Sequence, residues 1–394
     1  MTVEKLRAWW SYRQGLDGGL LGANAATVLR ESGWARSVGG VGPYLTLFSR
    51  AGIRRAEADR AVVNLDIHEL PSARGCTYVL PAEDFALGLA AGASFREADM
   101  RVCQKLGVTE AEIDALGEAV VAALNKGILS TDEIRDSVGD ACRSLGEEGK
   151  KKGMTTTLPT SLGKLQAVGR IRRVPFDGRL DQQRYKYTLW NPNPLTHFNL
   201  TPDEIHVELA RRYFHWIGPA TLAEFQWFSA LGVGAAKRAM SQLPLKPIEP
   251  GSERLILSDM RDEFEAFTAP KEPYYRLISS LDGISLLRRD VRSMIADEDL
   301  DTQVFRERDF AKLEGLADLP NHAIVDRGRL VGLWEFDTFT NSIVWRSFIP
   351  KSADLEKAVK EMEAFVQEDL GDARSFSLDS PKSRIPTIEA LRNA

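Results

Sequence analysis

The sequence has few of the residues that build disulfide frameworks and zinc sites. It contains three cysteines, Cys76, Cys103 and Cys142, and five histidines in 394 residues. The cysteines are widely spaced, with no CxxC pair and no histidine at ligand spacing. This pattern argues against both a disulfide scaffold and a zinc-finger site. We therefore expect no metal ion and no cofactor.

A long hydrophobic run is also missing. No stretch approaches the roughly 20 apolar residues of a membrane-spanning helix, and the N-terminus MTVEKLRAWW lacks the apolar centre of a signal peptide. We expect a soluble, cytoplasmic protein with no membrane contact and no obligatory protein partner. With 43% hydrophobic and 27% charged residues, the chain can bury sizeable cores. Its length predicts roughly two to four modules.

An overall excess of positive charge is absent as well. The net charge is −5, which argues against unspecific coating of DNA. A single basic face can still bind DNA, because salt confines the field of each charge to about 10 Å. The distribution of charge along the chain is therefore more informative than its sum.

The segment 158–190 has the pattern of a winged helix. Three leucines recur at helical spacing at its start, so one helix face packs inward. Two β-type runs follow, residues 170–174 and 185–189, and Asp177-Gly178 supplies a turn between them. A helix followed by such a hairpin predicts a module that can place a helix in a DNA groove and a wing beside it.

This segment also concentrates positive charge. Clustered Arg and Lys side chains on one module are the electrostatic footprint of a phosphate backbone. The alternative is a hairpin with an ordinary solvated charged face. We favour double-stranded DNA as the partner. The cations are Arg170, Arg172, Arg173, Arg179, Arg184 and Lys186, together with Lys150, Lys151, Lys152 and Lys164.

The order of predicted elements divides the chain into four parts. Residues 1–94 are predicted as a winged-helix-like domain and residues 95–192 as a second winged-helix domain that carries the basic wing. Residues 193–272 repeat the pattern, starting with a helix that Thr201 caps. Residues 273–394 form a β-rich module with a terminal helix. The predicted fold class is α/β, mainly α, with tandem winged-helix domains.

Several local signals make this organisation testable. Thr109 is a predicted helix N-cap, and Ser130 with Glu133 forms a predicted capping box. Three strand-like runs with hairpin turns lie within 322–348. The residues from 353 to 370 have the spacing of an amphipathic helix, and we expect a loosely ordered extension after it.

Four segments carry a family resemblance: residues 42–50, 72–85, the pair 210–213 and 218–221, and residues 324–332. Together they resemble the AlkZ-like family, winged-helix DNA glycosylases that remove bulky alkylated bases and unhook interstrand crosslinks. Each segment builds the fold, and their order agrees with the predicted modules. The resemblance implies tandem winged helices around a concave DNA-binding channel, with a wing hairpin that reaches the duplex.

The chain departs from this family at the catalytic motif. The family carries Gln-hydrophobic-Gln or Gln-hydrophobic-Asp shortly before the segment equivalent to Pro43, where a polar group positions the attacking water. Here Trp34-Ala35-Arg36 falls on the motif. Tryptophan only donates hydrogen bonds, and arginine stays protonated without an acceptor. Glu31 is the nearest residue able to orient water, and Arg36 could hold a phosphate or an anionic leaving base.

Other polar groups are weaker candidates. Asp66, His68 and Glu69 could be an acid-base or metal cluster, but a solvated helix end before a proline is the favoured interpretation. Arg74, before a predicted strand, fits phosphate contact or an internal ion pair equally well. Two further groups are expected to be structural: the core aromatics Trp216, Phe225, Trp227 and Phe228, and the exposed helix face with Arg288 and Arg289.

The sequence therefore favours a protein that binds duplex DNA and recognises or excises a damaged, alkylated or crosslinked base. The alternatives are a DNA-binding lesion sensor or transcriptional regulator without catalysis, which the missing glutamines favour, and a pure interaction scaffold. Formation of abasic sites separates the first two, and duplex binding in low salt separates both from the third. We expect Glu31 and Arg36 to be catalytic, and the DNA-binding residues to be Trp34, Arg36, Ser37, Tyr44, Arg74, Lys164, Arg170, Arg172, Arg173 and Lys186.

Overall fold

The structure of the protein, a computed structural model, describes residues 2–306 and 308–393. The N-terminal part pairs helices with a small antiparallel sheet of strand order β1-β3-β2. Its elements are α1 (Val3–Arg13), α2 (Ala25–Ser32), β1 (Ala35–Arg36), α3 (Gly42–Ala51), α4 (Arg55–Val63), β2 (Ile67–Pro71), β3 (Thr77–Pro81) and α5 (Phe85–Gly92).

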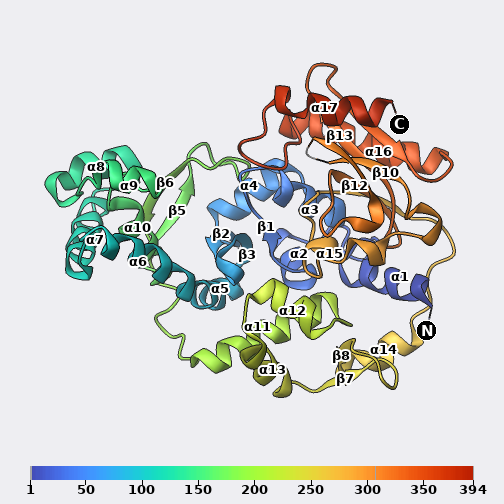
Figure 1. Ribbon diagram of the computed structural model, residues 1–394, viewed down its shortest axis with the longest axis horizontal. Helices are drawn as coiled ribbons and strands as arrows, with labels where there is room; N and C mark the ends of the chain where they lie inside the picture. Colours follow the sequence, from blue (N-terminus) through green and yellow to red (C-terminus); the bar gives the residue numbers. More distant parts are fainter. Residues whose placement is uncertain (1, 307, 394) are drawn as a thin grey trace.

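The second part forms the lobe on the left of Figure 1. Its sheet has the order β4-β6-β5, and residues 171–175 pair antiparallel with residues 185–189 as the predicted hairpin requires. The elements are α6 (Glu97–Lys105), α7 (Glu110–Leu124), β4 (Leu129–Ser130), α8 (Thr131–Val138), α9 (Gly146–Lys151), α10 (Leu158–Ala167), β5 (Ile171–Pro175) and β6 (Tyr185–Leu189).

The third part again places three helices before a two-stranded hairpin, β7-β8. It contains α11 (Pro202–Ile217), α12 (Leu222–Ser229), α13 (Val233–Ser241), β7 (Leu245–Pro247), β8 (Leu255–Leu257) and α14 (Arg261–Ala266). The capping residues Thr109, Ser130 and Thr201 each accept the expected backbone hydrogen bond, so these three local predictions are confirmed.

The C-terminal part is built on a four-stranded antiparallel sheet of order β14-β13-β12-β9 and a separate β10-β11 hairpin. Its elements are β9 (Tyr275–Ile278), α15 (Gly283–Leu286), β10 (Gln303–Arg306), β11 (Asp309–Lys312), β12 (His322–Asp326), β13 (Arg329–Asp337), β14 (Ser342–Ser347), α16 (Ala353–Phe365) and α17 (Pro381–Arg392). The mixture of helices with small antiparallel sheets confirms the α/β fold class.

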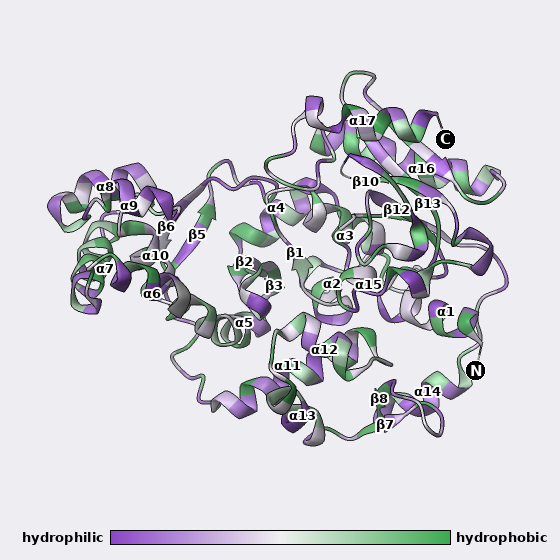
Figure 2. Ribbon diagram, viewed as in Figure 1, coloured by the Kyte–Doolittle hydropathy of each residue, from purple (hydrophilic) through white to green (hydrophobic). Residues whose placement is uncertain are grey.

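The apolar cores connect parts of the chain that are far apart in sequence. One core contains Trp9 and Trp10 of α1 together with Trp216 of α11, and a second contains Leu45 of α3 together with Trp334 of β13. The left-hand lobe has a core of its own, formed by leucines of α7 and α10 with Ile171 of β5 and Tyr187 of β6. Figure 2 shows that α8 on the lobe is mostly hydrophilic, whereas α5 is mostly hydrophobic.

Three predictions about the interior are wrong. His68 and Glu69 do not end a solvated helix, because they belong to the fully buried strand β2. Arg288 is 2% exposed and packs on the Trp10 ring instead of lying on an exposed helix face. The expected loose extension is anchored, since its backbone bonds to the loop before α3 and α17 then begins at Pro381.

Because the imidazole of His68 is buried, we expect the free energy of unfolding to depend on pH. Among the described residues its Nδ1 finds no hydrogen-bond partner, and its ring packs edge-on against Phe85 and Trp190. Burial, with help from the charges of Arg172 and Arg173, lowers the pKa of His68 to about 3. The unfolded chain takes up this proton near pH 6.5, so the contribution of His68 to stability is complete above that pH and is lost toward pH 3.

We therefore expect His68→Phe to reduce the loss of unfolding free energy on acidification, by up to about 1.4 kcal/mol per pH unit between pH 6 and 4. Denaturant unfolding of both proteins at several pH values measures the difference. The exposed His197→Gln variant controls for the loss of an imidazole. Parallel pH profiles for wild type and His68→Phe would contradict the prediction.

Candidate functional site

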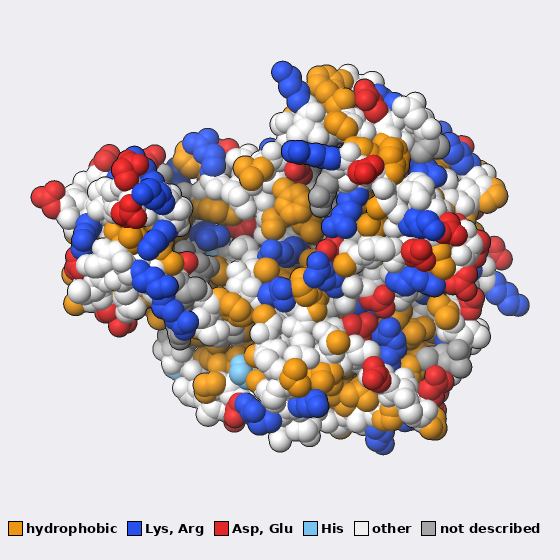
Figure 3. Space-filling model, in the orientation of Figure 1, with side chains coloured by type: hydrophobic (Ala, Val, Ile, Leu, Met, Phe, Trp, Pro, Cys, Tyr) orange, Lys and Arg blue, Asp and Glu red, His pale blue; other side chains and the backbone are white. Residues whose placement is uncertain are grey.

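A cavity of about 580 Å³ lies where β1 and β3 meet α12 and the C-terminal part. Figure 3 shows the face of the molecule seen in Figure 1, which is hollowed beside the left-hand lobe and carries Lys and Arg side chains near its middle. The cavity combines aromatic, cationic and acidic groups. Its chemically distinctive lining residues are Trp34, Arg36, Arg74, Tyr78, Trp227, Ser280, Glu335, Ser375, Phe376, Asp379 and Arg384.

Trp34 forms a fixed aromatic wall of the cavity. Its side chain is 3% exposed and packs edge-on against Trp216, with the ring centroids 5.2 Å apart. Its indole N–H donates to the buried carboxylate of Asp84 over 2.8 Å. Because that N–H is already engaged, Trp34 offers the cavity a ring face or edge and no acceptor.

Arg36 brings a positive charge to the same wall. It lies on β1, opposite Tyr78 of β3, and its guanidinium sits 5.4 Å from the centre of the Tyr78 ring. One Nη atom donates to the Thr77 carbonyl over 3.0 Å. Within the described part of the chain, no carboxylate forms an ion pair with Arg36. This cation can therefore meet an anionic group without first releasing an acidic partner.

Arg74 has an unusual conformation beside Trp227. Its φ is 58°, in the left-handed region that costs a non-glycine residue free energy. The guanidinium lies 3.7 Å from the centre of the Trp227 ring and donates to the Trp227 carbonyl over 2.9 Å. Arg289 packs on the same ring at 3.9 Å and is held by Asp318. Trp227 is thus half-buried at the cavity, whereas Trp216 and Phe225 are core residues as predicted, and the buried Phe228 lines the cavity as well.

Glu335 places a buried carboxyl group in the cavity. It lies on β13 with 6% exposure, and its Oε1 accepts from the Asn321 amide over 3.0 Å. Its Oε2 is 3.8 Å from the Arg384 guanidinium, which Asp372 also holds at 2.5 Å. Burial raises the pKa of Glu335 to about 7, although Asn321 and Arg384 act in the opposite direction. Such a carboxyl can exchange a proton near neutral pH.

Glu31, the carboxylate expected from sequence, lies elsewhere. It lies in the last turn of α2, where its Oε1 accepts from Arg30 over 2.9 Å and its Oε2 lies 3.3 Å from His215. It does not belong to the cavity lining. Burial alone would raise the pKa of Glu31, but the hydrogen bonds from Arg30 and His215 outweigh it and lower the pKa. The structure therefore gives Glu31 a place in a surface ion-pair network.

Ser37 and Tyr44 are also placed differently from the expectation of a DNA-facing surface. Ser37 is 2% exposed and its hydroxyl donates to Glu69 over 2.5 Å. Tyr44 is 1% exposed, donates to Asp59 over 2.5 Å and accepts the backbone N–H of Leu180 over 2.8 Å. Both side chains belong to internal hydrogen-bond networks, and neither reaches the surface.

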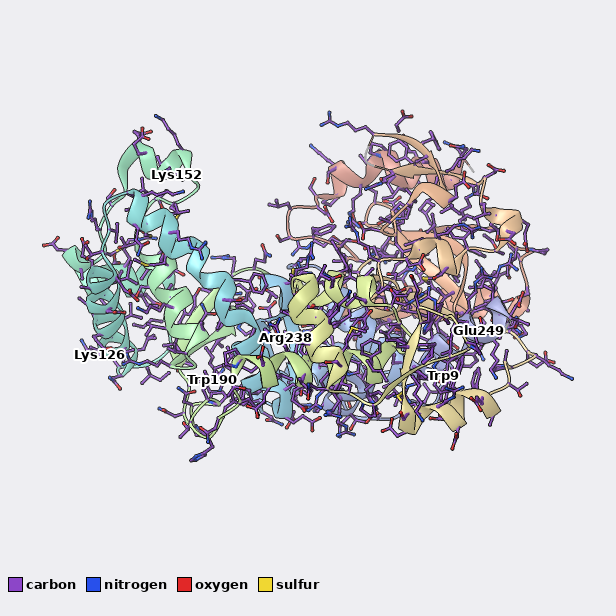
Figure 4. All side chains as sticks on the ribbon, turned by 60° about the horizontal axis from the view of Figure 1, so that its bottom comes forward. Trp9, Lys126, Lys152, Trp190, Arg238 and Glu249 are labelled. Carbon is purple, nitrogen blue, oxygen red and sulfur yellow. The ribbon has the colours of Figure 1, made fainter. Side chains whose placement is uncertain are left out.

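The cations of the second module are largely paired. Lys164 lies 3.0 Å from Glu110 and 2.6 Å from Asp114, while Arg170 forms a bidentate pair with Glu118. Lys150 and Lys151 pair with Glu147 and Glu148, and Figure 4 shows Lys126 and Lys152 on the outer part of the lobe. The positive charge available to DNA from this module is therefore smaller than the count of its cations indicates.

The two wing arginines Arg172 and Arg173 are partly buried. Arg172 is half-buried, and burial lowers its pKa. Arg173 packs 4.7 Å from the Tyr185 ring, and its positive charge acts on the buried Glu69. Lys186 lies 4.8 Å from the ring of Phe176 on the hairpin. Of these three cations, Arg172 and Arg173 contribute to the contact between the wing and β2.

The tip of the wing packs onto the protein itself. Leu180 is 1% exposed and belongs to the core shared by α3 and the C-terminal sheet. Arg179 donates to the Leu370 carbonyl over 3.1 Å. The resemblance implied a hairpin tip that reaches the duplex, but here the tip bridges two modules.

The glycine-rich loop before α3 allows two other segments of the chain to pack closely against its backbone. A Cβ atom on Gly40 would lie 2.1 Å from the Ser375 carbonyl oxygen, and one on Gly39 would lie 2.5 Å from the Gln183 side chain. The sequence suggested that these glycines let backbone approach a ligand. They instead let the segment after α16 and the wing pack on the loop that follows Arg36.

Comparison with known proteins gives this arrangement a context. The model of the AlkZ-like DNA glycosylase family matches residues 41–365. The chain belongs to this family. The match begins after Trp34-Ala35-Arg36, so the segment that departs from the glutamine motif lies just outside it. A search of curated proteins finds no match.

Among solved structures, the chain is similar to the Streptomyces sahachiroi DNA glycosylase AlkZ. The TM-score is 0.69 at 20% sequence identity, and the similarity covers 95% of this chain and 98% of the other. At this identity the likeness shows a shared fold. Membership in the AlkZ-like family implies a DNA substrate and the class of DNA repair glycosylases.

The described residues contain neither a cluster suited to a metal ion nor a helix suited to span a membrane. No group of three or more His, Cys, Asp or Glu side chains suited to a metal ion occurs among residues 2–306 and 308–393. None of the helices in that part of the chain combines the length and apolar character needed to cross a membrane.

Sequence reasoning missed the acidic wall of the cavity. Glu335 stands in the run LVGLWEF, where it is the one charged residue among apolar neighbours. An isolated charge in a strand that is otherwise buried is unusual, because burial of an ionised group is costly. That signal was available, but nothing in the sequence placed this strand opposite Arg36.

Proposed function

We propose that the chain binds damaged duplex DNA and hydrolyses the N-glycosidic bond of a base held in the cavity of about 580 Å³. The observation that carries this proposal is the meeting of an aromatic wall, the arginines Arg36 and Arg74, and a buried carboxyl in one cavity of an AlkZ-like protein. Aromatic rings stack on an unpaired base, and arginines bind phosphate. Glu335 supplies the acceptor that the Trp34-Ala35-Arg36 segment lacks.

The chemistry assigned to Glu335 is that of a general base. A water molecule attacks the sugar C1′ while the C1′–N bond breaks and its electron pair leaves with the base. The Glu335 carboxylate takes the proton from that water, and the Asn321 amide keeps the carboxylate oriented over 3.0 Å. The products are the free base and an abasic site. Arg36 stabilises negative charge on a phosphate or on the departing base.

A second candidate function is lesion binding without excision. It is favoured by the side chains at the motif position, because Trp34 is engaged with Asp84 and Arg36 has no acceptor atom. Under this alternative the cavity holds a damaged base, and Glu335 only neutralises Arg384. Family membership does not distinguish the two, since both require DNA binding.

Release of bases from a panel of alkylated and crosslinked duplexes distinguishes these functions. We expect enzyme-dependent abasic sites, detected as alkali-labile strand breaks, on at least one lesion. Duplex binding without abasic sites would support the sensor instead. The absence of binding at low salt would remove both functions and leave a protein-interaction scaffold.

Arg36 and Arg74 are expected to supply phosphate contacts. We expect Arg36→Ala and Arg74→Ala each to lower the slope of log K against log salt concentration by about one unit, because each lost contact releases one counterion fewer. Fluorescence anisotropy with a labelled duplex at several salt concentrations measures this slope. Lys126→Ala, on the outer part of the lobe in Figure 4, is the matched control. Equal slopes for all three variants would contradict the assignment.

A further inference from the structure

The segment between α16 and α17 exposes two large apolar side chains. Leu378 is 92% exposed and Phe376 is 45% exposed. Leaving apolar area of this size in water is unfavourable, and exposed apolar groups at the edge of a binding site often mark a contact with a partner. These two side chains lie on the same short turn, which we call the rim turn, residues 374–380.

The rim turn is held at its start and in its middle by hydrogen bonds to the loop before α3. Val41 N–H donates to the Arg374 carbonyl over 3.0 Å, and Ser377 N–H donates to the Val38 carbonyl over 3.2 Å. Within the turn, Phe376 N–H donates to the Asp379 carboxylate over 2.7 Å. The apolar side chains therefore stand on an ordered backbone, so little conformational entropy is lost when they contact a partner.

Further contacts fix the rim turn to the wing. The Arg374 guanidinium donates to the Asp181 carbonyl over 2.9 Å, and the Ser377 hydroxyl donates to Gln183 over 2.8 Å. Gly40 makes this packing possible, since a side chain there would collide with the Ser375 carbonyl. The loop after β1 that follows Arg36 and the rim turn thus form one rigid edge.

The rim turn lies at the mouth of the cavity. Phe376 lines the cavity and is also 45% exposed, so its ring spans the boundary between the cavity and solvent. Ser375 and Asp379 on either side of it line the cavity as well. In Figure 1 the turn projects from the C-terminal part toward the open region beside the left-hand lobe.

We propose that Phe376 and Leu378 are an apolar wedge that enters the base stack of duplex DNA and fills the gap left by the base in the cavity. The proposal rests on the proposed function for the identity of the ligand. Apolar side chains that enter a base step replace lost base stacking and keep the duplex open. A rigid turn at the cavity mouth suits this task, because the gap in the stack lies beside the displaced base.

The test uses a duplex in which 2-aminopurine, mispaired with cytosine, is the base expected to enter the cavity. Its fluorescence rises when 2-aminopurine loses stacking on its neighbours. We expect the wild-type protein to increase the fluorescence, and the Phe376→Ala, Leu378→Ala double variant to lose most of the increase and to bind this duplex roughly tenfold more weakly. Leu378→Met, which keeps an apolar side chain of similar size, should retain the signal.

Phe339→Ala is the matched control. Phe339 is 67% exposed in the turn between β13 and β14 and does not line the cavity. Its loss should leave fluorescence and affinity unchanged. A full fluorescence increase with the double variant, or an equal decrease with Phe339→Ala, would overturn the wedge.

Base release measured in parallel separates this proposal from the proposed function. Suppose the double variant loses the fluorescence increase and the wild type releases no base from any lesion. The wedge is then supported, and the proposed excision is contradicted. If wild type and double variant release a base equally fast, excision stands and the wedge fails. Thermal unfolding of each variant shows whether the rim turn substitutions leave the fold intact.

Discussion

Replacing Glu335 with Gln is expected to slow base release by about 100-fold or more in single-turnover experiments, the usual contribution of a positioned general base. Gln keeps the size and the hydrogen-bonding capacity toward Asn321 but cannot accept a proton from water. Because burial raises the pKa of Glu335 to about 7, the wild-type rate should rise with pH up to that value and then level off. The Gln variant should have lost this rise.

The pH profile makes the prediction specific for chemistry. A purely structural role of Glu335 in holding Arg384 would change stability or affinity without removing an ionisation from the rate. Glu31→Gln is the control, since Glu31 belongs to the surface network with Arg30 and His215. Unchanged rates for Glu335→Gln would show that another group activates water. A rate lost in Glu31→Gln but kept in Glu335→Gln would restore the role expected from sequence.

Asp282→Asn is expected to destabilise the protein by about 3–5 kcal/mol, the cost of leaving a buried charge without its partner. Asp282 is completely buried, and its two oxygens accept from Arg50 over 2.8 and 2.7 Å. Arg50 is itself 1% exposed and also donates to Gln14 over 3.1 Å. The substitution leaves the guanidinium in the interior with only neutral partners.

This pair connects distant parts of the chain. Arg50 comes from α3 and Asp282 from the turn before α15, and Gln14 also donates to the Trp216 carbonyl of α11 over 3.0 Å. A denaturant or thermal unfolding curve measures the loss. Arg135→Ala removes an exposed pair with Asp132 and should change stability by less than about 1 kcal/mol. Similar curves for Asp282→Asn and wild type would contradict the prediction.

Local features of the fold were predictable because they depend on neighbours in sequence. The predicted capping box at Ser130 and the predicted N-cap at Thr201 both occur, and Thr201 also forms a capping box with Glu204. The hairpin of β5 and β6 follows from two β-type runs and a turn whose Gly178 takes a φ of 74°. Such signals act within one helical turn or one hairpin and do not require knowledge of the remaining chain.

The candidate site was predictable only in part. The family resemblance directed attention to Trp34 and Arg36, and both side chains line the cavity. The same reasoning chose Glu31 as the water-orienting residue because it is the carboxylate nearest in sequence to Trp34-Ala35-Arg36. In the structure its side chain instead lies beside His215. Glu335 lies about 300 residues away along the chain and reaches the cavity because the sheet of β12 and β13 packs on α3.

The sequence by itself determined the element types, the helix caps, the winged hairpins and the kinship to a DNA glycosylase family. Tertiary structure decided which charges are available. Arg173 and Lys164 look alike in the sequence as cations of a basic module, yet one packs on Tyr185 near the buried Glu69 and the other lies between two carboxylates. The physical reason is that the hydration and pairing of a charge depend on whatever segment folds against it, and those segments are distant in sequence.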